Sequence, residues 1–162
     1  MERLWAPWRM EYIGQAREGK DERCLFCEKP KERDDEKALI VARSENSFAI
    51  LNRYPYNSGH LMVAPFRHVG ELEAVEHDES LDMQLLMQRC VKALKEAMQP
   101  DGFNIGMNLG TVAGAGIPDH LHWHVVPRWN GDTNFMPVIG DVKVMPERLL
   151  SSFRRVVEFL SK

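Results

Sequence analysis

The sequence has 162 residues and a formal net charge of −3, with 44% hydrophobic and 28% charged residues. This length and composition suit a single domain over residues 1–162, and the small negative charge gives no general attraction to nucleic acid or to an anionic membrane, so we expect neither as a partner. No apolar run approaches the roughly 20 residues that span a bilayer, and the first residues lack a signal-peptide pattern, so we expect a cytoplasmic protein.

Residues 1–35 are expected to form an N-terminal arm that precedes the core. Trp5 and Trp8 have to bury against the same domain or against a partner subunit, and the sequence leaves that choice open. Cys24 and Cys27 form a C-x-x-C pair, and Cys90, in a helical stretch, is expected to be a small buried apolar residue. An odd number of cysteines argues against a disulfide framework, so the pair is a zinc site, a redox pair or a chance pattern.

Residues 36–129 are expected to form the core, with a sheet as its main element. Short apolar runs separated by turn formers predict strands, and the first two runs are close enough to form a hairpin. The five predicted strands cover residues 38–42, 47–51, 60–65, 103–109 and 121–126.

Two helices are predicted from apolar residues at helical spacing. Residues 78–99 form the longer one, with Asp78 or Ser80 as the N-cap and Pro100 beyond its end. Residues 130–162 are a C-terminal extension whose helix opens at Pro146. The order of elements predicts an α+β fold, an antiparallel sheet of about five strands with a long helix and a C-terminal helix.

Three of the six histidines alternate along the fifth predicted strand, as His120, His122 and His124. Side chains on a strand alternate between its two faces, so the three imidazoles point to one side and the apolar residues between them point to the core. Three imidazoles on one face are costly to bury without partners. The pattern therefore indicates chemistry rather than core packing.

Two kinds of chemistry suit alternating histidines. They can hold a catalytic zinc ion, or a neutral imidazole can attack phosphorus and become a phosphoramidate. A hydrolytic zinc site needs a further ligand close by, and Asp119 is the one carboxylate next to the run. Gly110, Gly114 and Gly116 lie just upstream, and glycines let backbone N–H groups approach phosphate oxygens. We therefore favour phosphate chemistry.

The run HLHWHVVP at residues 120–127 resembles the signature of the histidine triad family. Residues 48–55 and 59–65 are similar to the nucleoside-binding strands of that family. Residues 4–9 and 126–135 are similar to one branch of it, the bacterial diadenosine tetraphosphate phosphorylase type. The resemblance implies the fold of this family, often called HIT-like.

The resemblance also implies roles for individual residues. His122 would attack the α-phosphorus and carry a nucleoside monophosphate covalently. His124 would hydrogen-bond phosphate oxygens, and His60 would orient the ring of the nucleophile from behind. The residues implied to bind the nucleotide are Asn52 at the ribose, Leu51 and Phe48 at the pocket wall, and Asn108, Gly114, Ala115 and Gly116 at the phosphates.

The glycine-rich loop departs from the family pattern. Several members carry Gln, Ser or Thr four or five residues before the first histidine, where this chain has Ala115 and Gly116. We expect backbone N–H groups to assist the leaving group instead, and the small loop to leave room for an incoming phosphate. Trp129, Phe135 and Met136 are expected either over the nucleotide base or at a subunit interface.

The resemblance gives the cysteine pair a role as well. Triad proteins with an N-terminal C-x-x-C bind zinc through residues that correspond to Cys24, Cys27, His68 and His120. The site would be closed and tetrahedral, a structural staple with no open position for catalysis. His120 would then have a structural role, whereas His122 and His124 would take part in the reaction.

Four functions are compatible with these patterns. The favoured one is phosphorolysis of diadenosine tetraphosphate to ADP and ATP, with adenine nucleotides and inorganic phosphate as partners. The second uses water instead, as a dinucleoside polyphosphate hydrolase or a nucleoside phosphoramidase. The third is a nucleotide-binding protein without catalysis, and the fourth is a zinc-dependent hydrolase that uses all three triad histidines. The family also implies a homodimer or a higher homo-oligomer.

Overall fold

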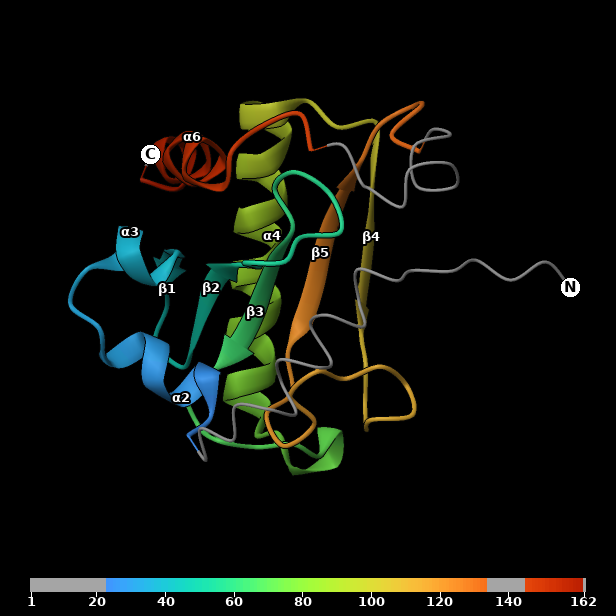
Figure 1. Cartoon of the computed structure of the whole chain (residues 1–162). Helices are drawn as coiled ribbons and strands as arrows, with labels where there is room; N and C mark the ends of the chain where they lie inside the picture. The colour runs from blue at the N-terminus through green and yellow to red at the C-terminus, as the bar shows by residue number, and fades with distance from the viewer. Residues whose placement is uncertain (1–22, 134–144, 162) are drawn as a thin grey trace, which may run out of the picture.

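The structure is a computed structural model that describes residues 23–133 and 145–161. Within this part of the chain, five strands form one antiparallel sheet in the order β1-β2-β3-β5-β4 (Figure 1). The strands are β1 Ile40–Arg43, β2 Ser47–Leu51, β3 Leu61–Pro65, β4 Gly102–Met107 and β5 Trp123–Arg128. The predicted α+β class with a five-stranded antiparallel sheet is confirmed.

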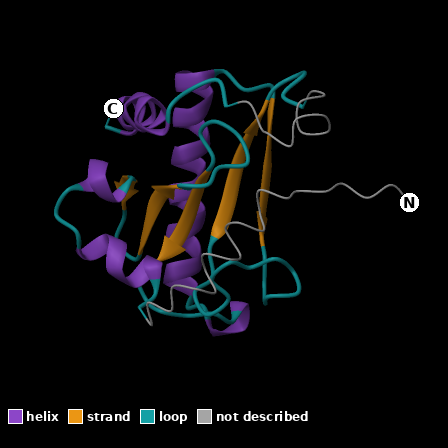
Figure 2. Ribbon diagram, in the orientation of Figure 1, coloured by secondary structure: helices purple, strands orange, loops and turns teal. Residues whose placement is uncertain are grey.

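The helices divide between one long element and several short ones (Figure 2). They are α2 Leu25–Glu28, α3 Asp35–Ala38, α4 His77–Met98 and α6 Leu149–Leu160, with short 3-10 helices η1 Lys29–Lys31 and η2 Leu72–Ala74. Among the described residues, no helix is both long enough and apolar enough to cross a membrane.

The strand register separates the sheet into two chemically different faces. Directly opposed residues on antiparallel strands point to the same face. Ile50 lies opposite Met62, and Met62 lies opposite His124, so these three side chains share one face. Leu61 lies opposite Val125 on the other face. His124 and Val125 therefore point in opposite directions, as the alternation predicts.

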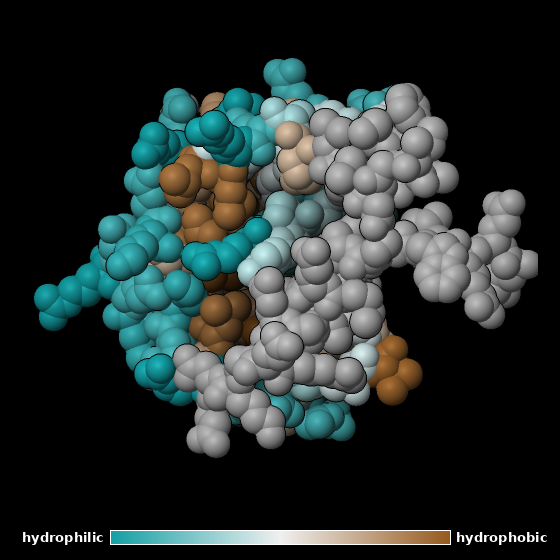
Figure 3. Space-filling model, viewed as in Figure 1, coloured by the Kyte–Doolittle hydropathy of each residue, from teal (hydrophilic) through white to brown (hydrophobic). Residues whose placement is uncertain are grey.

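Helix α4 covers the face that carries Leu61 and Val125 (Figure 1). Ser47 belongs to this face by alternation along β2, and its hydroxyl donates a hydrogen bond to Asp82 of α4 at 2.6 Å. The apolar residues that α4 buries are Met83, Leu86, Met87, Cys90, Ala93 and Leu94. The histidine face thus stays free of α4. Figure 3 shows apolar side chains gathered between α6 and α2 on the side turned to the viewer.

The start of α4 differs from the prediction, because the N-cap is Glu76 and neither Asp78 nor Ser80. The backbone N–H of Glu76 donates to the Glu79 carboxylate at 3.0 Å, which closes the first turn. The guanidinium of Arg67 also hydrogen-bonds this carboxylate, at 2.6 Å, and holds the pKa of Glu79 below its usual range. This ion pair ties the end of β3 to α4.

Four of the five strands differ at their boundaries from the prediction, by one to two residues at either end, and two of these differences matter for the site. Ala38 is the last residue of α3 instead of the first residue of a strand, and Leu39 then reverses the chain with a φ of 66°. Strand β5 begins at Trp123, so His120 and His122 lie just before it. They still approach the sheet, because the backbone N–H of Leu121 bonds to the carbonyl of Val69 at 2.8 Å.

The C-terminal helix is present as predicted, with Phe153 and Val156 buried, but it begins three residues after Pro146. Trp5, Trp8, Phe135 and Met136, for which burial or an interface was expected, lie outside the described residues.

Gly59 sets the turn that delivers His60 to β3. Its φ is +73°, a conformation that favours glycine. A Cβ atom at this position would also lie 2.6 Å from the Met98 sulfur, at the end of α4. The positive φ therefore favours glycine here, and any larger residue would also have to displace the Met98 side chain.

Replacement of Asp82 by Asn is expected to lower the free energy of unfolding by about 1–2 kcal/mol at neutral pH. The effect is this small because solvent screens the charge of a half-buried carboxylate. Burial opposes ionisation of this carboxyl, but hydrogen bonds from Ser44 and Ser47 hold its pKa below the usual value. Such a group stabilises the fold above its unfolded pKa of about 3.9 and loses that contribution as pH falls through the folded-state pKa. The difference between the two proteins should therefore close below about pH 4.

Urea unfolding at a series of pH values measures this difference. Glu96→Gln, the same chemical change at an exposed position of α4, is the control and should stay within about 0.5 kcal/mol of wild type. A difference for Asp82→Asn that persists unchanged into acid would contradict the assignment.

Candidate active site

Three histidines gather on the sheet face opposite α4. The rings of His122 and His124 have centroids 4.9 Å apart, and those of His60 and His124 are 5.2 Å apart. His124 lies on β5, and His122 lies just before it. His60 precedes β3, the strand that pairs with β5. The pairing of these two strands therefore assembles the cluster.

The protonation of His122 follows from one hydrogen bond. Its Nδ1 lies 2.9 Å from the carbonyl oxygen of His120. A carbonyl only accepts, so Nδ1 carries the proton and Nε2 keeps its lone pair. Burial lowers the pKa of His122, whose side chain is 5% exposed. The ring is therefore a neutral base at neutral pH, with Nε2 available as a nucleophile.

The hydrogen bonds of His60 give it the opposite tautomer to that of His122, and they also determine the tautomer of His124. The backbone N–H of Tyr56 donates to Nδ1 of His60 at 3.0 Å, so the proton of His60 is on Nε2. That Nε2 lies 3.0 Å from Nδ1 of His124 and donates to it. His124 then carries its own proton on Nε2 and offers an N–H donor. The hydrogen bond of His60 thus goes to His124. The family resemblance instead implies that His60 orients the nucleophile, His122.

A second cluster brings together Cys24, Cys27, His68 and His120, the four expected zinc ligands. Their donor atoms all lie within 4.8 Å of one another. Cys24 Sγ and His120 Nδ1 are 3.3 Å apart, and Cys27 Sγ and His68 Nδ1 are also 3.3 Å apart. A tetrahedral zinc site with the usual bond lengths has ligand–ligand distances of about 3.3–3.8 Å. The residues therefore fit a zinc ion.

The other nitrogen of His120 supports this fit. Its Nε2 donates to the carbonyl oxygen of Pro65 at 2.9 Å, so the lone pair of Nδ1 faces the sulfur atoms. Burial, together with the neighbouring Cys24 side chain, raises the pKa of Cys27. A bound cation would offset this effect and hold the thiolate form.

Some expected nucleotide-binding residues lie near the histidines. Asn52 follows β2, and its Nδ2 is 3.5 Å from Nδ1 of His60. Its Oδ1 accepts the backbone N–H of Tyr54 at 2.9 Å. Phe48 lies opposite Ala64, on the same face as Ile50 and His124, and is completely buried. Asn52 and Phe48 are thus on the expected side of the sheet.

Leu51 and Trp129 are not brought to this face. Leu51 lies opposite Leu61 on the face that α4 covers, and it is 1% exposed. Trp129 donates from its indole nitrogen to the carbonyl oxygen of Met98 at 3.3 Å, at the end of α4. Both side chains therefore pack on the helical side of the sheet.

The glycine-rich loop uses part of its hydrogen-bonding capacity internally. The backbone N–H of Gly114 donates to Thr111, and that of Ala115 donates to Gly110, at 3.0 and 3.2 Å. Asn108 reaches the carbonyl oxygen of Gly114 at 3.5 Å. The loop is therefore held in shape by its own turn, and Gly116 is exposed beyond it.

Two residues of the site were not expected from the sequence. Phe26 is 1% exposed, and its ring centroid lies 4.6 Å from that of His122 and 5.2 Å from that of His120. Tyr56 stacks on His60 with centroids 4.8 Å apart. Only the C-x-x-C around Phe26 hints at its position.

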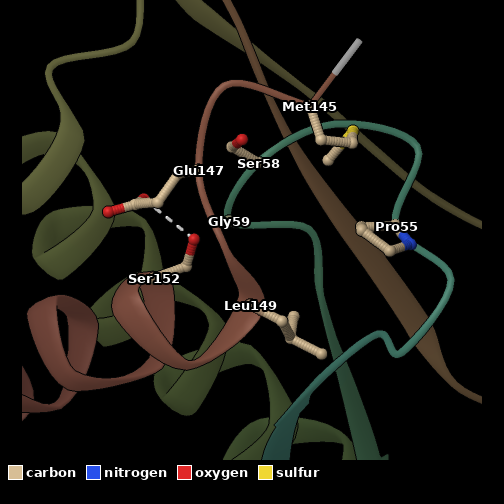
Figure 4. Close-up of a pocket in the computed structure, with 7 residues that line it drawn as sticks. All are labelled: Pro55, Ser58, Gly59, Met145, Glu147, Leu149 and Ser152. Carbon is tan, nitrogen blue, oxygen red and sulfur yellow. Dashed lines mark hydrogen bonds between the residues drawn. The ribbon is translucent and has the colours of Figure 1, made fainter. Parts of the chain in front are cut away.

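Two hollows in the described surface lie elsewhere. One, of about 210 Å³, lies between α6 and the turn before β3, where the Ser152 hydroxyl donates to Glu147 (Figure 4). The neighbouring one, of about 380 Å³, includes Trp129. Neither is lined by a triad histidine. The candidate site is therefore located by its chemistry rather than by the size of a hollow.

Comparison with known proteins agrees with this chemistry. The sequence profile of the HIT domain matches residues 33–131. An AP-4-A phosphorylase of Mycobacterium tuberculosis is 45% identical over 163 aligned residues, which cover 97% of this chain and 83% of that protein. An adenosine 5'-monophosphoramidase of Schizosaccharomyces pombe is 28% identical over 66% of this chain and 75% of its own.

Solved structures share the fold. A zinc-bound histidine triad family protein from Mycobacterium smegmatis superposes with a TM-score of 0.69 at 29% identity, over 86% of this chain and 94% of that one. A uridylyltransferase mutant gives a TM-score of 0.70 over 98% of this chain and 54% of its own, at 17% identity, which shows a similar fold only.

The assigned tautomers can be measured by ¹⁵N NMR of the imidazole nitrogens. We expect His122 to be protonated at Nδ1 and His60 at Nε2 near neutral pH, because their hydrogen-bond partners are a carbonyl and an amide N–H. His77, which is exposed, provides the reference signal. A spectrum in which Nε2 of His122 carries the proton would contradict the assignment of a nucleophile.

Proposed function

The chain belongs to the histidine triad (HIT) family, and on this premise we propose that it is an enzyme that splits diadenosine tetraphosphate by phosphorolysis, giving ADP and ATP. The observation that carries the proposal is the hydrogen bond from Nδ1 of His122 to the His120 carbonyl. It leaves a neutral imidazole with a free Nε2 lone pair beside an N–H donor, which is the pair of groups that nucleotidyl transfer needs.

In the first step, Nε2 of His122 attacks the α-phosphorus. An N–P bond forms, the bond from this phosphorus to the bridging oxygen of the β-phosphate breaks, and ATP leaves. The ring gains positive charge as the bond forms, and the Nδ1–H hydrogen bond to the carbonyl of His120 strengthens accordingly. The same contact thus both selects the nucleophilic nitrogen and stabilises the intermediate.

His124 acts on the phosphate oxygens. Its Nε2–H points away from His60, whose own Nε2–H occupies the other nitrogen at 3.0 Å. A fixed N–H donor close to the reacting phosphorus stabilises the charge that builds on non-bridging oxygens in the transition state. Tyr56 and His60 do not touch the substrate in this scheme and keep His124 in its donor tautomer.

In the second step, inorganic phosphate attacks the phosphorus of the nucleotidyl group. The new P–O bond forms, the N–P bond to His122 breaks, and ADP leaves. The 45% identity to an AP-4-A phosphorylase supports phosphate as the acceptor. Ala115 and Gly116 contribute small groups to the loop before the triad, which leaves space for a second anion.

The main alternative is discharge of the same intermediate by water. The monophosphoramidase among the relatives favours this possibility for the family at large. A zinc-dependent hydrolase that uses all three histidines fits the geometry less well. Neither nitrogen of His120 is available to a metal ion shared with His122 and His124, because Nε2 donates to the carbonyl oxygen of Pro65 and Nδ1 faces the cysteines.

We assign a structural zinc ion to Cys24, Cys27, His68 and His120. Three separations between the donor atoms, 3.3, 3.3 and 3.6 Å, match a tetrahedral zinc site, and the zinc-bound relative from Mycobacterium smegmatis supports the choice of metal. The ion would close the N-terminal segment onto the sheet, with four protein ligands and no open position for a substrate.

Product analysis with and without phosphate tests the reaction. Purified protein with diadenosine tetraphosphate should give ADP and ATP only when phosphate is present, because phosphate is the second nucleophile. AMP and ATP formed without phosphate would show that water discharges the intermediate. Labelled phosphate should appear in ADP, which identifies the acceptor directly.

Replacement of His122 by Ala should reduce turnover by at least about a thousandfold, because no other group replaces its nucleophilic nitrogen. The zinc content should stay unchanged, since His122 is not a ligand. His77→Ala, an exposed histidine on α4, is the control and should keep wild-type activity. Loss of zinc in His122→Ala would favour the zinc-hydrolase alternative.

The metal assignment has its own test in a Cys24→Ser, Cys27→Ser double variant. Elemental analysis should find about one zinc per wild-type chain and almost none in the variant, because two of the four ligands are lost. Cys90→Ser, which changes a buried thiol outside the cluster, is the control and should retain the metal. Equal zinc in both variants would refute the assignment.

A further inference from the structure

Phe26 lies between the two cysteines of the proposed zinc site and against the imidazole of the nucleophile. We propose that Phe26 is a positioning residue for His122, and that the Cys24–Cys27–His68–His120 cluster acts on nucleotidyl transfer through it. The inference rests on the proposed function, because it assigns the ring of Phe26 a task in that reaction.

The contact itself restricts the ring of His122. The centroids of Phe26 and His122 are 4.6 Å apart, with the planes inclined by 39°. The ring of His124 lies 4.9 Å away at an angle of 71°. One nitrogen is also bonded to the carbonyl of His120. Rotation of the nucleophile would break all three contacts, so the lone pair of Nε2 keeps one direction.

The position of Phe26 depends in turn on the cluster. Helix α2 has only 4 residues, and its N-cap residue Cys24 makes no side-chain capping bond. A single turn of this length is not stable by itself in water. Cys24 precedes the turn and Cys27 lies within it, on either side of Phe26, and their sulfur atoms lie 3.3 Å from the imidazoles of His120 and His68, respectively. The cluster therefore anchors the chain on both sides of Phe26.

A parallel route runs through His120. Its imidazole belongs to the cluster, and its carbonyl accepts the proton of His122 Nδ1. Phe26 also packs against this residue, with centroids 5.2 Å apart. Loss of the metal should therefore loosen the nucleophile from two sides. The expected result is slower transfer to His122, with little change in the affinity for nucleotide.

Phe26→Leu tests the inference, since leucine keeps an apolar group in the core but removes the aromatic face. Phe66→Leu is the matched control, because Phe66 stacks on Phe48 at 5.3 Å and no contact of its ring with the triad is found among the described residues. Both variants should retain zinc. Phe26→Met provides a second variant of similar volume if the first one folds poorly.

Rapid-quench measurement of the nucleotidyl-His122 intermediate gives the rate of the first step. We expect a decrease of about ten- to a hundredfold in Phe26→Leu, because a displacement of about 1 Å costs up to about a hundredfold in a well-aligned reaction. The dissociation constant for the nucleotide should stay within about threefold of wild type. Phe66→Leu should react within about twofold of the wild-type rate.

Imidazole ¹⁵N NMR gives a readout that needs no turnover. In Phe26→Leu, the population of His122 protonated at Nδ1 should fall, because the ring is free to leave the carbonyl of His120. The Cys24→Ser, Cys27→Ser variant should show the same change although Phe26 is still present.

Either of two results would overturn the inference. One is a Phe26→Leu variant with the wild-type transfer rate and tautomer population. The other is loss of zinc from this variant, which would make Phe26 a residue that only supports the cluster. Failure of the proposed function is distinguishable in both of its forms. If water replaces phosphate, nucleotidyl-His122 still forms and its rate of formation can still be compared. If no nucleotidyl transfer occurs, wild-type protein forms no nucleotidyl-His122, and the NMR comparison still reports on the packing.

Discussion

The hydrogen bond from His122 to the carbonyl of His120 is the contact on which the candidate site depends. It spans only two residues, yet it decides which imidazole nitrogen is free. Its geometry requires the chain before β5 to hold the carbonyl of His120 toward the neighbouring ring. That condition is met because Leu121 is bonded to Val69 and the imidazole of His120 is bonded to Pro65. The nucleophile is thus oriented by backbone that the end of β3 holds in place.

The sheet separates packing from chemistry. One face supplies a mainly apolar surface to α4, and its buried polar residue Ser47 is bonded to Asp82 of that helix. The other carries imidazoles with nitrogens bonded to backbone groups, to each other or to sulfur, while Nε2 of His122 keeps its lone pair for the reaction. Because buried imidazoles without such partners are costly, this matching is what makes the histidine face compatible with a stable fold. Gly59 serves both faces, since its turn lets α4 pack closely while it directs His60 to the opposite side.

Much of this arrangement follows from the sequence. Period-two alternation predicts the histidine face, and the family pattern supplies the four residues of the cysteine cluster, which the structure brings together. The same alternation separates Phe48 from Leu51, three positions apart on β2, although the resemblance implied both for one pocket wall. Phe26 and Tyr56 could not be predicted, because their contacts arise when α2 and the turn before β3 fold across the sheet. The cap at Glu76 carries no clear signal in the sequence, because a capping box formed by two glutamates lacks the usual Ser or Thr.

The pairing of β3 with β5 has a consequence for the folding pathway. His60 and His124 are 64 positions apart in the chain, and Cys24 and His120 are 96 apart. Contacts of such long sequence separation close large loops and form slowly compared with the local turns of α4. A chain with its helices formed but β5 not yet docked would therefore have neither the nucleophile geometry nor the complete set of metal ligands. Activity and metal affinity therefore appear only after this long-range closure has taken place.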